Sequence, residues 1–207
     1  NHKMLYKTQY TNEWKDCYAE DFGETGKIVP VSGLINREDY PISDEMLRLI
    51  VWAVTDGHIK NAYVRFGFAK NRKIERLTTL LSDMGIDYQI KLSSWKTSAG
   101  NEVTHIKFKN DLGLTKVLSS YDFMTKLSAR QINILINEYS HTDGTRAFTG
   151  KTSYEEREGK LPHIQLSTNI KEDADLLQYL CVISGNKCNM LSAIKKRVTR
   201  QYFLSIR

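Results

Sequence analysis

The sequence is poor in the residues that cross-link small proteins or anchor proteins in membranes. Its three cysteines, Cys17, Cys181 and Cys188, are odd in number and stand in no metal-ligand spacing. This excludes a disulfide scaffold or a zinc ribbon and favours a reducing compartment. No apolar run approaches the roughly 20 residues that a transmembrane helix needs, and the opening "NHKMLYK" is no signal peptide. We therefore expect a soluble, intracellular protein of the cytoplasm or nucleoid with no membrane partner.

Acidic residues are also in deficit. The chain of 207 residues has 30 Lys and Arg against 24 Asp and Glu, which gives a net charge of +6. A basic surface admits a polyanionic partner such as nucleic acid, although most basic proteins simply carry a solvated surface. The length is sufficient to bury one core, or two cores of about 100 residues each.

Proline is the third scarce residue, with three in the chain, of which Pro30 and Pro41 come early. The first 42 residues are polar and aromatic and show no sustained hydrophobic period. We expect residues 1–42 to be an extended lead-in segment, because no helical or strand period is present there.

Residues 43–126 predict a unit in the order α-β-β-α-β-β. Ser43 or Asp44 caps a helix that stops before Gly57. The alternation in "YVRFGF" is typical of a half-buried strand, and "NRKIERLTTLLSDMGI" has helical spacing. The segments "DYQIKLSSW" and "EVTHIKFK" predict a hairpin.

Residues 127–207 repeat this order. Ser128 and Gln131 form a capping-box signal for a helix that ends at Asp143-Gly144. A strand in "LPHIQLSTN", a helix in "KEDADLLQYLCVISG" and strands in "NMLSAIKKRVT" and "QYFLSIR" follow. The tract "TSYEEREGK" lengthens the first hairpin of this half. Thr55-Asp56-Gly57 and Thr142-Asp143-Gly144 close equivalent helices, so the sequence predicts a duplicated unit.

The opening helix is apolar on every side between Arg48 and Thr55. We expect it to pack on its counterpart at residues 130–142 about a pseudo-twofold axis, with both C-termini at one end. Asp56 and Asp143 then approach each other, and two such carboxylates repel unless a proton or cation lies between them. A divalent cation with oxygen ligands, usually Mg²⁺, relieves that repulsion.

The two helix ends "LIVWAVTDG" and "INEYSHTDG" resemble the nine-residue motif of the LAGLIDADG homing endonucleases, most closely the single-chain kind found in inteins. The resemblance covers residues 40–207. It implies an α+β fold of two pseudo-symmetric units with four-stranded antiparallel saddle sheets around a central two-helix interface. It also implies a monomer that makes a Mg²⁺-dependent double-strand break in a long duplex DNA site.

The resemblance implies roles for three residues. Asp56 and Asp143 match the motif aspartates that bind the divalent metal and a scissile phosphate. Lys116, in "TKVLSSYDF", matches the Lys-x-aliphatic-Pro segment of the family with Ser119 in the place of the proline. Its implied role is to activate water or to stabilise charge on the phosphoryl group.

The motifs depart from the family pattern at the first glycine, where Val51 and Glu138 stand. The second motif is polar, from which we expect a looser second helix. The lead-in "NHKML" and "IVPVSG" resemble the end of an intein splicing half. The splicing nucleophile and the closing His-Asn are absent, so we expect no splicing.

Strand alternation predicts a DNA-reading face. If the apolar residues of each sheet face the helices, the intervening side chains face a major groove. In the first half these are Tyr63, Arg65, His105, Lys107 and Lys109. In the second half these are His163, Gln165, Ser167, Ser205 and Arg207. Lys70, Arg72 and Lys73 are interpreted as a solvated helix start.

Two alternatives remain open from the sequence. One is a DNA-binding regulator or an RNA maturase on the same fold, which binds without cutting. The other is an intein endonuclease fragment that has lost activity, for which the polar second motif is the evidence.

Overall fold

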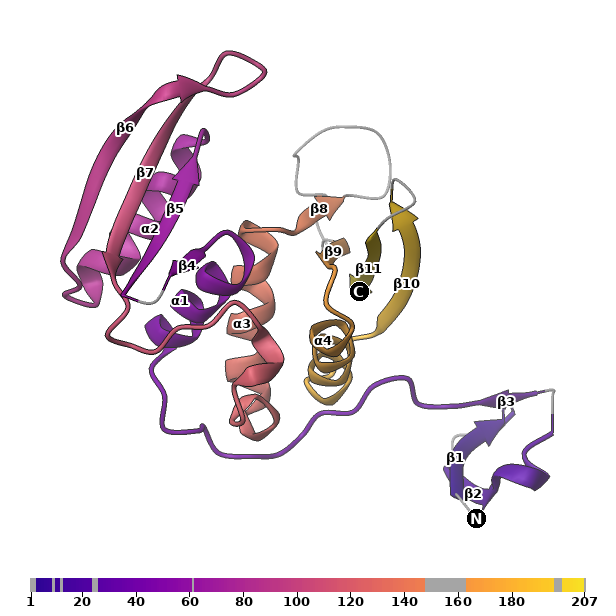
Figure 1. Cartoon of the computed structure of the whole chain (residues 1–207). Helices are drawn as coiled ribbons and strands as arrows, with labels where there is room; N and C mark the ends of the chain where they lie inside the picture. The colour runs from indigo at the N-terminus through magenta and orange to yellow at the C-terminus, as the bar shows by residue number, and fades with distance from the viewer. Residues whose placement is uncertain are drawn as a thin grey trace.

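The computed structural model describes residues 3–8, 10–11, 13–23, 26–60, 62–147, 163–195 and 199–206. Within them, two helices lie side by side at the centre with a four-stranded sheet on each side (Figure 1). A small sheet lies at the far end of a long connecting segment (Figure 1). None of the helices in these ranges has the length and apolar character that a membrane crossing requires.

The first half runs in the predicted α-β-β-α-β-β order. Its elements are α1 (Asp44–Thr55), β4 (His58–Lys60), β5 (Tyr63–Phe68), α2 (Asn71–Asp83), β6 (Tyr88–Lys96) and β7 (Glu102–Lys109). The strands form an antiparallel sheet in the order β4-β5-β7-β6. The buried side chains of β5, with Ile106 and Phe108 of β7, point to one face of this sheet, as the alternation predicts. Val103 is also buried, but it lies on the other face beside Gly67 and His105.

The second half repeats both the element order and the strand order. After the short helices η2 (Leu118–Ser120) and η3 (Met124–Lys126) come α3 (Ala129–His141), β8 (Thr145–Ala147), β9 (His163–Thr168), α4 (Lys171–Ile183), β10 (Cys188–Lys195) and β11 (Thr199–Ile206). The sheet order is β10-β11-β9-β8, which is that of the first sheet read from the other edge. The predicted polar insertion at 152–160 lies outside the described residues.

Local sequence signals fix the ends of the central helices. The Ser43 hydroxyl accepts the Met46 amide at 3.1 Å, and Ser128 with Gln131 forms the predicted capping box. At the other ends, a Cβ on Gly57 would lie 2.5 Å from the Ala53 carbonyl oxygen, and a Cβ on Gly144 would lie 2.5 Å from Cα of Ser140. Both turns therefore require glycine, and each holds the preceding Asp at a helix end.

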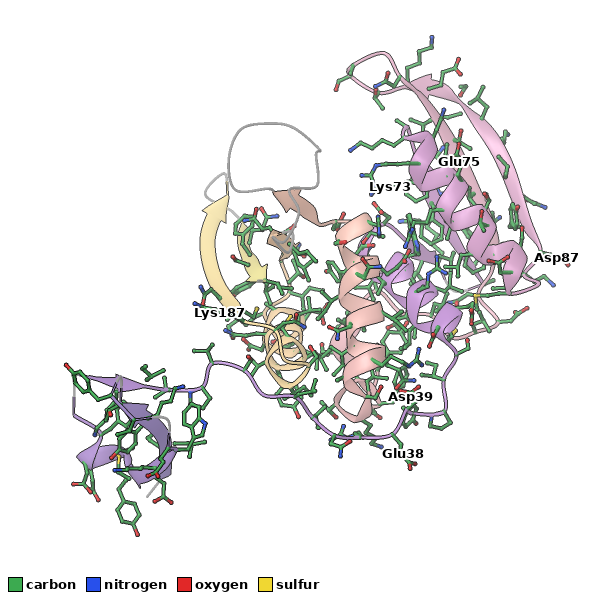
Figure 2. The ribbon with its side chains drawn as sticks, turned by 180° about the vertical axis from the view of Figure 1, so that it is seen from behind. Glu38, Asp39, Lys73, Glu75, Asp87 and Lys187 are labelled. Carbon is green, nitrogen blue, oxygen red and sulfur yellow. The ribbon has the colours of Figure 1, made fainter. Side chains whose placement is uncertain are left out.

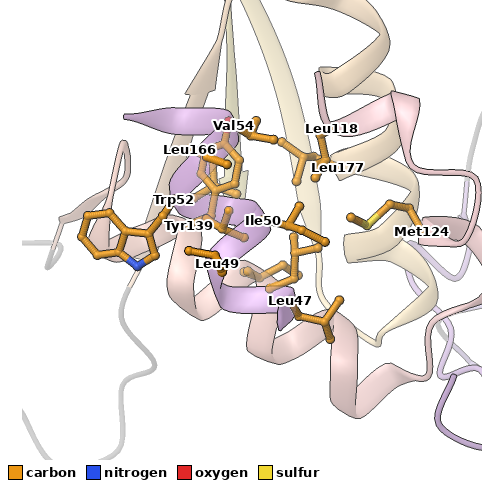
Figure 3. Packing of buried hydrophobic residues seen from close by; sticks show 14 of the residues in the cluster. Leu47, Leu49, Ile50, Trp52, Val54, Leu118, Met124, Tyr139, Leu166 and Leu177 are labelled. Atoms are coloured by element: carbon orange, nitrogen blue, oxygen red, sulfur yellow. The ribbon is translucent and has the colours of Figure 1, made fainter. Parts of the chain in front are cut away.

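The core is continuous across the two halves. Helix α1 is buried on all sides from Leu49 to Val54, as its sequence predicts. Figure 3 shows its side chains meeting residues of α3, α4, β9 and the segment between the halves. The labelled members are Leu47, Leu49, Ile50, Trp52, Val54, Leu118, Met124, Tyr139, Leu166 and Leu177.

A buried carboxylate lies in this apolar contact. Glu138 of α3 is 1% exposed, accepts the Trp52 indole N–H at 2.7 Å and pairs with Arg48 at 3.1 Å. Arg76 of α2 donates to both carboxylate oxygens at 2.8 and 2.6 Å. Burial alone would raise the pKa of Glu138, but Arg76, Arg48 and Trp52 outweigh it and lower that pKa. The expectation of a looser second helix is wrong, because the polar Glu138 is fully bonded inside the interface.

The lead-in also differs from expectation. Residues 3–28 hold β1 (Lys3–Thr8), β2 (Lys15–Tyr18), the turn η1 (Ala19–Asp21) and β3 (Lys27–Ile28). These strands form a three-stranded antiparallel sheet in the order β2-β1-β3. Lys27 lies over the rings of Tyr6 and Phe22 and caps this small cluster. Asn1 and His2, which carry part of the intein resemblance, lie outside the described residues.

The connecting segment, residues 29–43, crosses from the second half to the first. Gly33 and Ile35 donate their amides to the end of α4 at 2.9 and 2.8 Å. Further along, Asp39 accepts from Ser128 and pairs with Arg130, both at the start of α3. Arg130 and Ser128 lower the pKa of the Asp39 carboxyl. The segment thus contacts both helices of the second half before it enters α1.

Replacing Glu138 with Ala should lower the free energy of unfolding by about 2–3 kcal/mol, because it removes charged hydrogen bonds and opens a hole beside Trp52. Urea unfolding followed by Trp fluorescence measures this. Glu75→Ala, on the exposed side of α2, is the matched control and should change stability by no more than about 0.5 kcal/mol. Equal losses in the two variants would mean that the Glu138 network adds nothing.

Candidate active site

The first predicted aspartate lies at the C-cap of α1. The Asp56 amide donates to the Trp52 carbonyl at 3.1 Å, and Gly57 then turns the chain into β4. The side chain is 19% exposed, so it is partly shielded but reachable. The last carbonyls of a helix carry partial negative charge. The Asp56 carboxylate therefore adds charge to an end that is already negative.

The second aspartate lies at the matching end of α3. Asp143 follows the C-cap Thr142, and Gly144 donates its amide to Tyr139 at 3.1 Å. Partial burial raises the pKa of the Asp143 carboxyl, the charge of Asp56 raises it further, and Lys73 and Lys116 oppose both. The two carboxylates thus lie close enough to repel.

Lys116 lies beside the same helix ends. Its ammonium donates to the Thr55 carbonyl at 2.6 Å, at the C-terminus of α1. Partial burial lowers the pKa of Lys116, against the opposing charges of Asp143 and Asp56. The segment that follows is fixed by Asp173 of α4, whose buried carboxylate accepts the amides of Leu118 and Ser119 at 3.1 and 2.8 Å.

Lys73 is a fourth member of the cluster that the sequence interpretation missed. Its ammonium contacts Asp56 at 2.6 Å, and its side chain is 12% exposed. Figure 2 shows it between α2 and the end of α3. The interpretation of residues 70–73 as a solvated helix start is wrong for Lys73. Arg72 is exposed, as that interpretation has it, and its guanidinium also donates to the His141 carbonyl at 3.2 Å. Lys73 and Arg72 reach the C-terminal ends of α1 and α3 only because α2 crosses over them in the fold.

The cluster has a suitable donor set for a hard divalent cation. Two carboxylates supply oxygen ligands, and Mg²⁺ is often held by one or two carboxylates with the remaining positions filled by water and substrate phosphate. Among the described residues no three His, Cys, Asp or Glu side chains gather as a metal site, so the protein alone offers an incomplete shell. The residues fit a cation that is bound together with a phosphate.

The predicted reading face of the first sheet is solvent-facing. Arg65 lies opposite Lys107, and Tyr63 lies opposite Lys109, in the β5–β7 register. The Lys107 ammonium lies 4.0 Å from the centre of the Tyr63 ring. Arg65, Lys107 and Lys109 are exposed, whereas His105 is half-buried with Nδ1 3.4 Å from the Phe66 carbonyl oxygen. One face of this sheet is thus basic and aromatic.

The corresponding face of the second sheet is polar. Gln165 lies opposite Ser205, and Ser167 lies opposite Phe203, in the β9–β11 register. Gln165 is exposed, and both serines are half-buried. The backbone of His163 begins β9, but its side chain lies outside the described part of the molecule, as does the whole of Arg207.

No protein-family model and no curated protein sequence matches the chain. Solved structures do show a similar fold. The N-terminal LAGLIDADG domain of DUF199/WhiA matches with a TM-score of 0.52 at 12% identity, over 84% of this chain and 86% of that one. Full-length DUF199/WhiA from Thermatoga maritima matches with a TM-score of 0.52 at 12% identity, over 81% of this chain. This chain spans about half of that protein, 52% of its length.

The homing endonuclease I-DmoI is similar as well. In its complex with DNA and Mn it matches with a TM-score of 0.55 at 9% identity, over 79% of this chain and 89% of that one. At such identities the likeness shows the fold alone. The chain therefore has the mixed α+β arrangement of LAGLIDADG proteins, as the motif resemblance implies.

Asp143→Asn should stabilise the protein at neutral pH. The folded state raises the pKa of Asp143, so it binds this proton more tightly than the unfolded chain does, and stability is lost as pH rises from about 3.8 through the raised pKa. The gain should be present above that range and absent below it. Because the side chain is solvent-accessible, we expect less than about 1 kcal/mol. Thermal unfolding between pH 3.5 and 7.5, with Asp111→Asn in an exposed loop as control, measures it. A gain that grows toward low pH would contradict the assigned repulsion.

Proposed function

We propose that this chain is a site-specific, Mg²⁺-dependent DNA endonuclease that makes a double-strand break in a long duplex site. The observation that carries the proposal is the meeting of Asp56 and Asp143 at two helix ends beside Lys116 and Lys73. A cluster of two carboxylates and two ammonium groups suits the binding of a cation together with a phosphate diester. The likeness in fold to I-DmoI, solved with DNA and Mn, supports it.

The halves, residues 43–126 and 127–207, are proposed to lie about a pseudo-twofold axis as a monomer, with saddle-shaped sheets that straddle the duplex. Asp56 and Asp143 would hold the divalent cations. A bound Mg²⁺ would stabilise charge that develops on the phosphoryl group and make water a better nucleophile. Lys116 would donate from the α1 end to a phosphate oxygen, where its positive charge is most useful as negative charge grows.

A second candidate is a protein that binds DNA on this fold without cutting it. The observation in its favour is the contact of Lys73 with Asp56, because an ammonium already neutralises one of the two carboxylates. An endonuclease fragment that has lost activity would likewise bind DNA without cutting it. Cleavage in the presence of Mg²⁺ separates these candidates from the nuclease.

Asp56→Asn and Asp143→Asn should each lower the rate of double-strand cleavage by more than about a hundredfold, because each removes a cation ligand. DNA affinity should be kept or increased, because a negative charge beside the phosphates is lost. Duplexes selected by binding from a randomised pool serve as substrates with Mg²⁺. Asp83→Asn, at the exposed end of α2, should cut as the unchanged protein does. Cleavage by both aspartate variants at the normal rate, or none by the unchanged protein, would refute the proposal.

Arg65→Ala and Lys109→Ala should separate base reading from phosphate binding on the first sheet. An arginine can pair bidentately with guanine and discriminate by about 1–3 kcal/mol, so Arg65→Ala should relax preference at one or two base pairs. Lys109→Ala should weaken all sequences alike and reduce the dependence of affinity on salt. Affinities for a panel of single-base variants of the selected site, at several salt concentrations, measure both. The reverse result would mean that the assignment of the reading face is wrong.

A further inference from the structure

The two aspartates have different surroundings, although the halves share one element order. Helices α2 and α4 both have 13 residues, and their third residues are Lys73 and Asp173. Lys73 reaches Asp56 with its ammonium at 2.6 Å. Asp173 instead turns a buried carboxylate to the amides of Leu118 and Ser119. At the same helix position, one half supplies an ammonium group to its aspartate, and the other supplies a carboxylate to the start of η2.

The contact between Lys73 and Asp56 is more than a surface ion pair. Both side chains are largely shielded, at 12% and 19% exposure, and the Lys73 ammonium also lies 5.6 Å from the centre of the Phe68 ring. Shielding strengthens the attraction relative to an exposed pair, and the aromatic face adds to it. The Lys73 ammonium is therefore held on the Asp56 carboxylate, which would need to be free of it to bind a metal ion.

We propose that Lys73 is an internal counter-ion that holds Asp56 in the cation-free protein, so that a divalent cation binds first at Asp143. This inference rests on the proposed function, since it takes both aspartates as cation ligands. A cation at Asp56 must displace the Lys73 ammonium, whereas Asp143 has no lysine in direct contact among the described ion pairs. The order of cation binding comes from this difference in lysine contact, because each position offers the same ligand, one aspartate carboxylate.

The counter-ion also relieves the repulsion at the helix ends. With Lys73 in place, part of the charge that Asp56 presents to Asp143 is offset, so the pair can stay close without a metal. The displaced ammonium would then be free to meet a DNA phosphate beside the cation.

The test is a Mn²⁺ titration of the whole protein without DNA, followed by water-proton relaxation, which needs no nuclease activity. Lys73→Met keeps the length of the side chain and removes its charge, so it should bind Mn²⁺ at least about tenfold more tightly. Adding Asp56→Asn to it should abolish that gain. Lys70→Met removes the same charge from an exposed position at the start of α2 and should change affinity by no more than about twofold. With Lys73 intact, Asp143→Asn should weaken Mn²⁺ binding more than Asp56→Asn does.

Three results would overturn the inference. These are no gain in Lys73→Met, a gain that survives Asp56→Asn, or an equal gain in Lys70→Met. Each can be read whether or not the protein cuts DNA. Conversely, absence of cleavage alongside the expected Mn²⁺ affinities would remove the proposed nuclease function and leave the counter-ion role intact.

Discussion

The packing of α1 on α3 is the constraint on which the rest of the structure depends. Helix α1 is apolar on every side from Leu49 to Val54, so this stretch must be covered by its own half and by the other. Glu138 is the polar element in that contact, and its partners Arg48, Trp52 and Arg76 all belong to the first half. A buried carboxylate with directional partners tolerates few alternative registers. The register that satisfies Glu138 also brings the ends of both helices together, and so brings Asp56 to Asp143.

The negative charge gathered at the ends of α1 and α3 is unfavourable by itself, and positive groups from outside these two helices balance it. Two helix C-termini and two carboxylates converge, which concentrates negative charge. The balancing charges come from α2, through Lys73, and from the segment after β7, through Lys116. Neither lysine belongs to the helices that carry the aspartates. Neighbouring elements therefore position the two ammonium groups, while the central helices position the two carboxylates. This charged cluster would not assemble on either helix alone.

Features set by local sequence were predictable, and features set by crossing elements were not. The helix ends follow from Ser43, Ser128 and the two Asp-Gly turns, because caps and periods act within a few residues. Lys73 lies 17 residues from Asp56 in the chain, and Arg76 lies 62 residues from Glu138, so nothing in their own segment indicates the partner. The same applies to residues 3–28, whose strands show no sustained hydrophobic period and are held by pairing among themselves. The duplicated Asp-Gly helix ends indicated Asp56 and Asp143, and the motif resemblance added Lys116, which periodicity alone would have left as an ordinary surface residue.

The two halves share one order of helices and strands but differ in the charge of their described side chains. The first half supplies Lys73 and the basic face of Arg65, Lys107 and Lys109. On the second sheet the described outward residues include Gln165, Ser167 and Ser205, which hydrogen-bond without charge. Lysine side chains mainly add phosphate affinity, whereas the Arg65 guanidinium, amides and hydroxyls can add selectivity at base edges. Among the described side chains, the charged groups that could meet a duplex therefore lie on the first sheet, and uncharged groups that could meet base edges lie on the second. Such a division needs no symmetry in the DNA, which is what a single chain with two diverged halves allows.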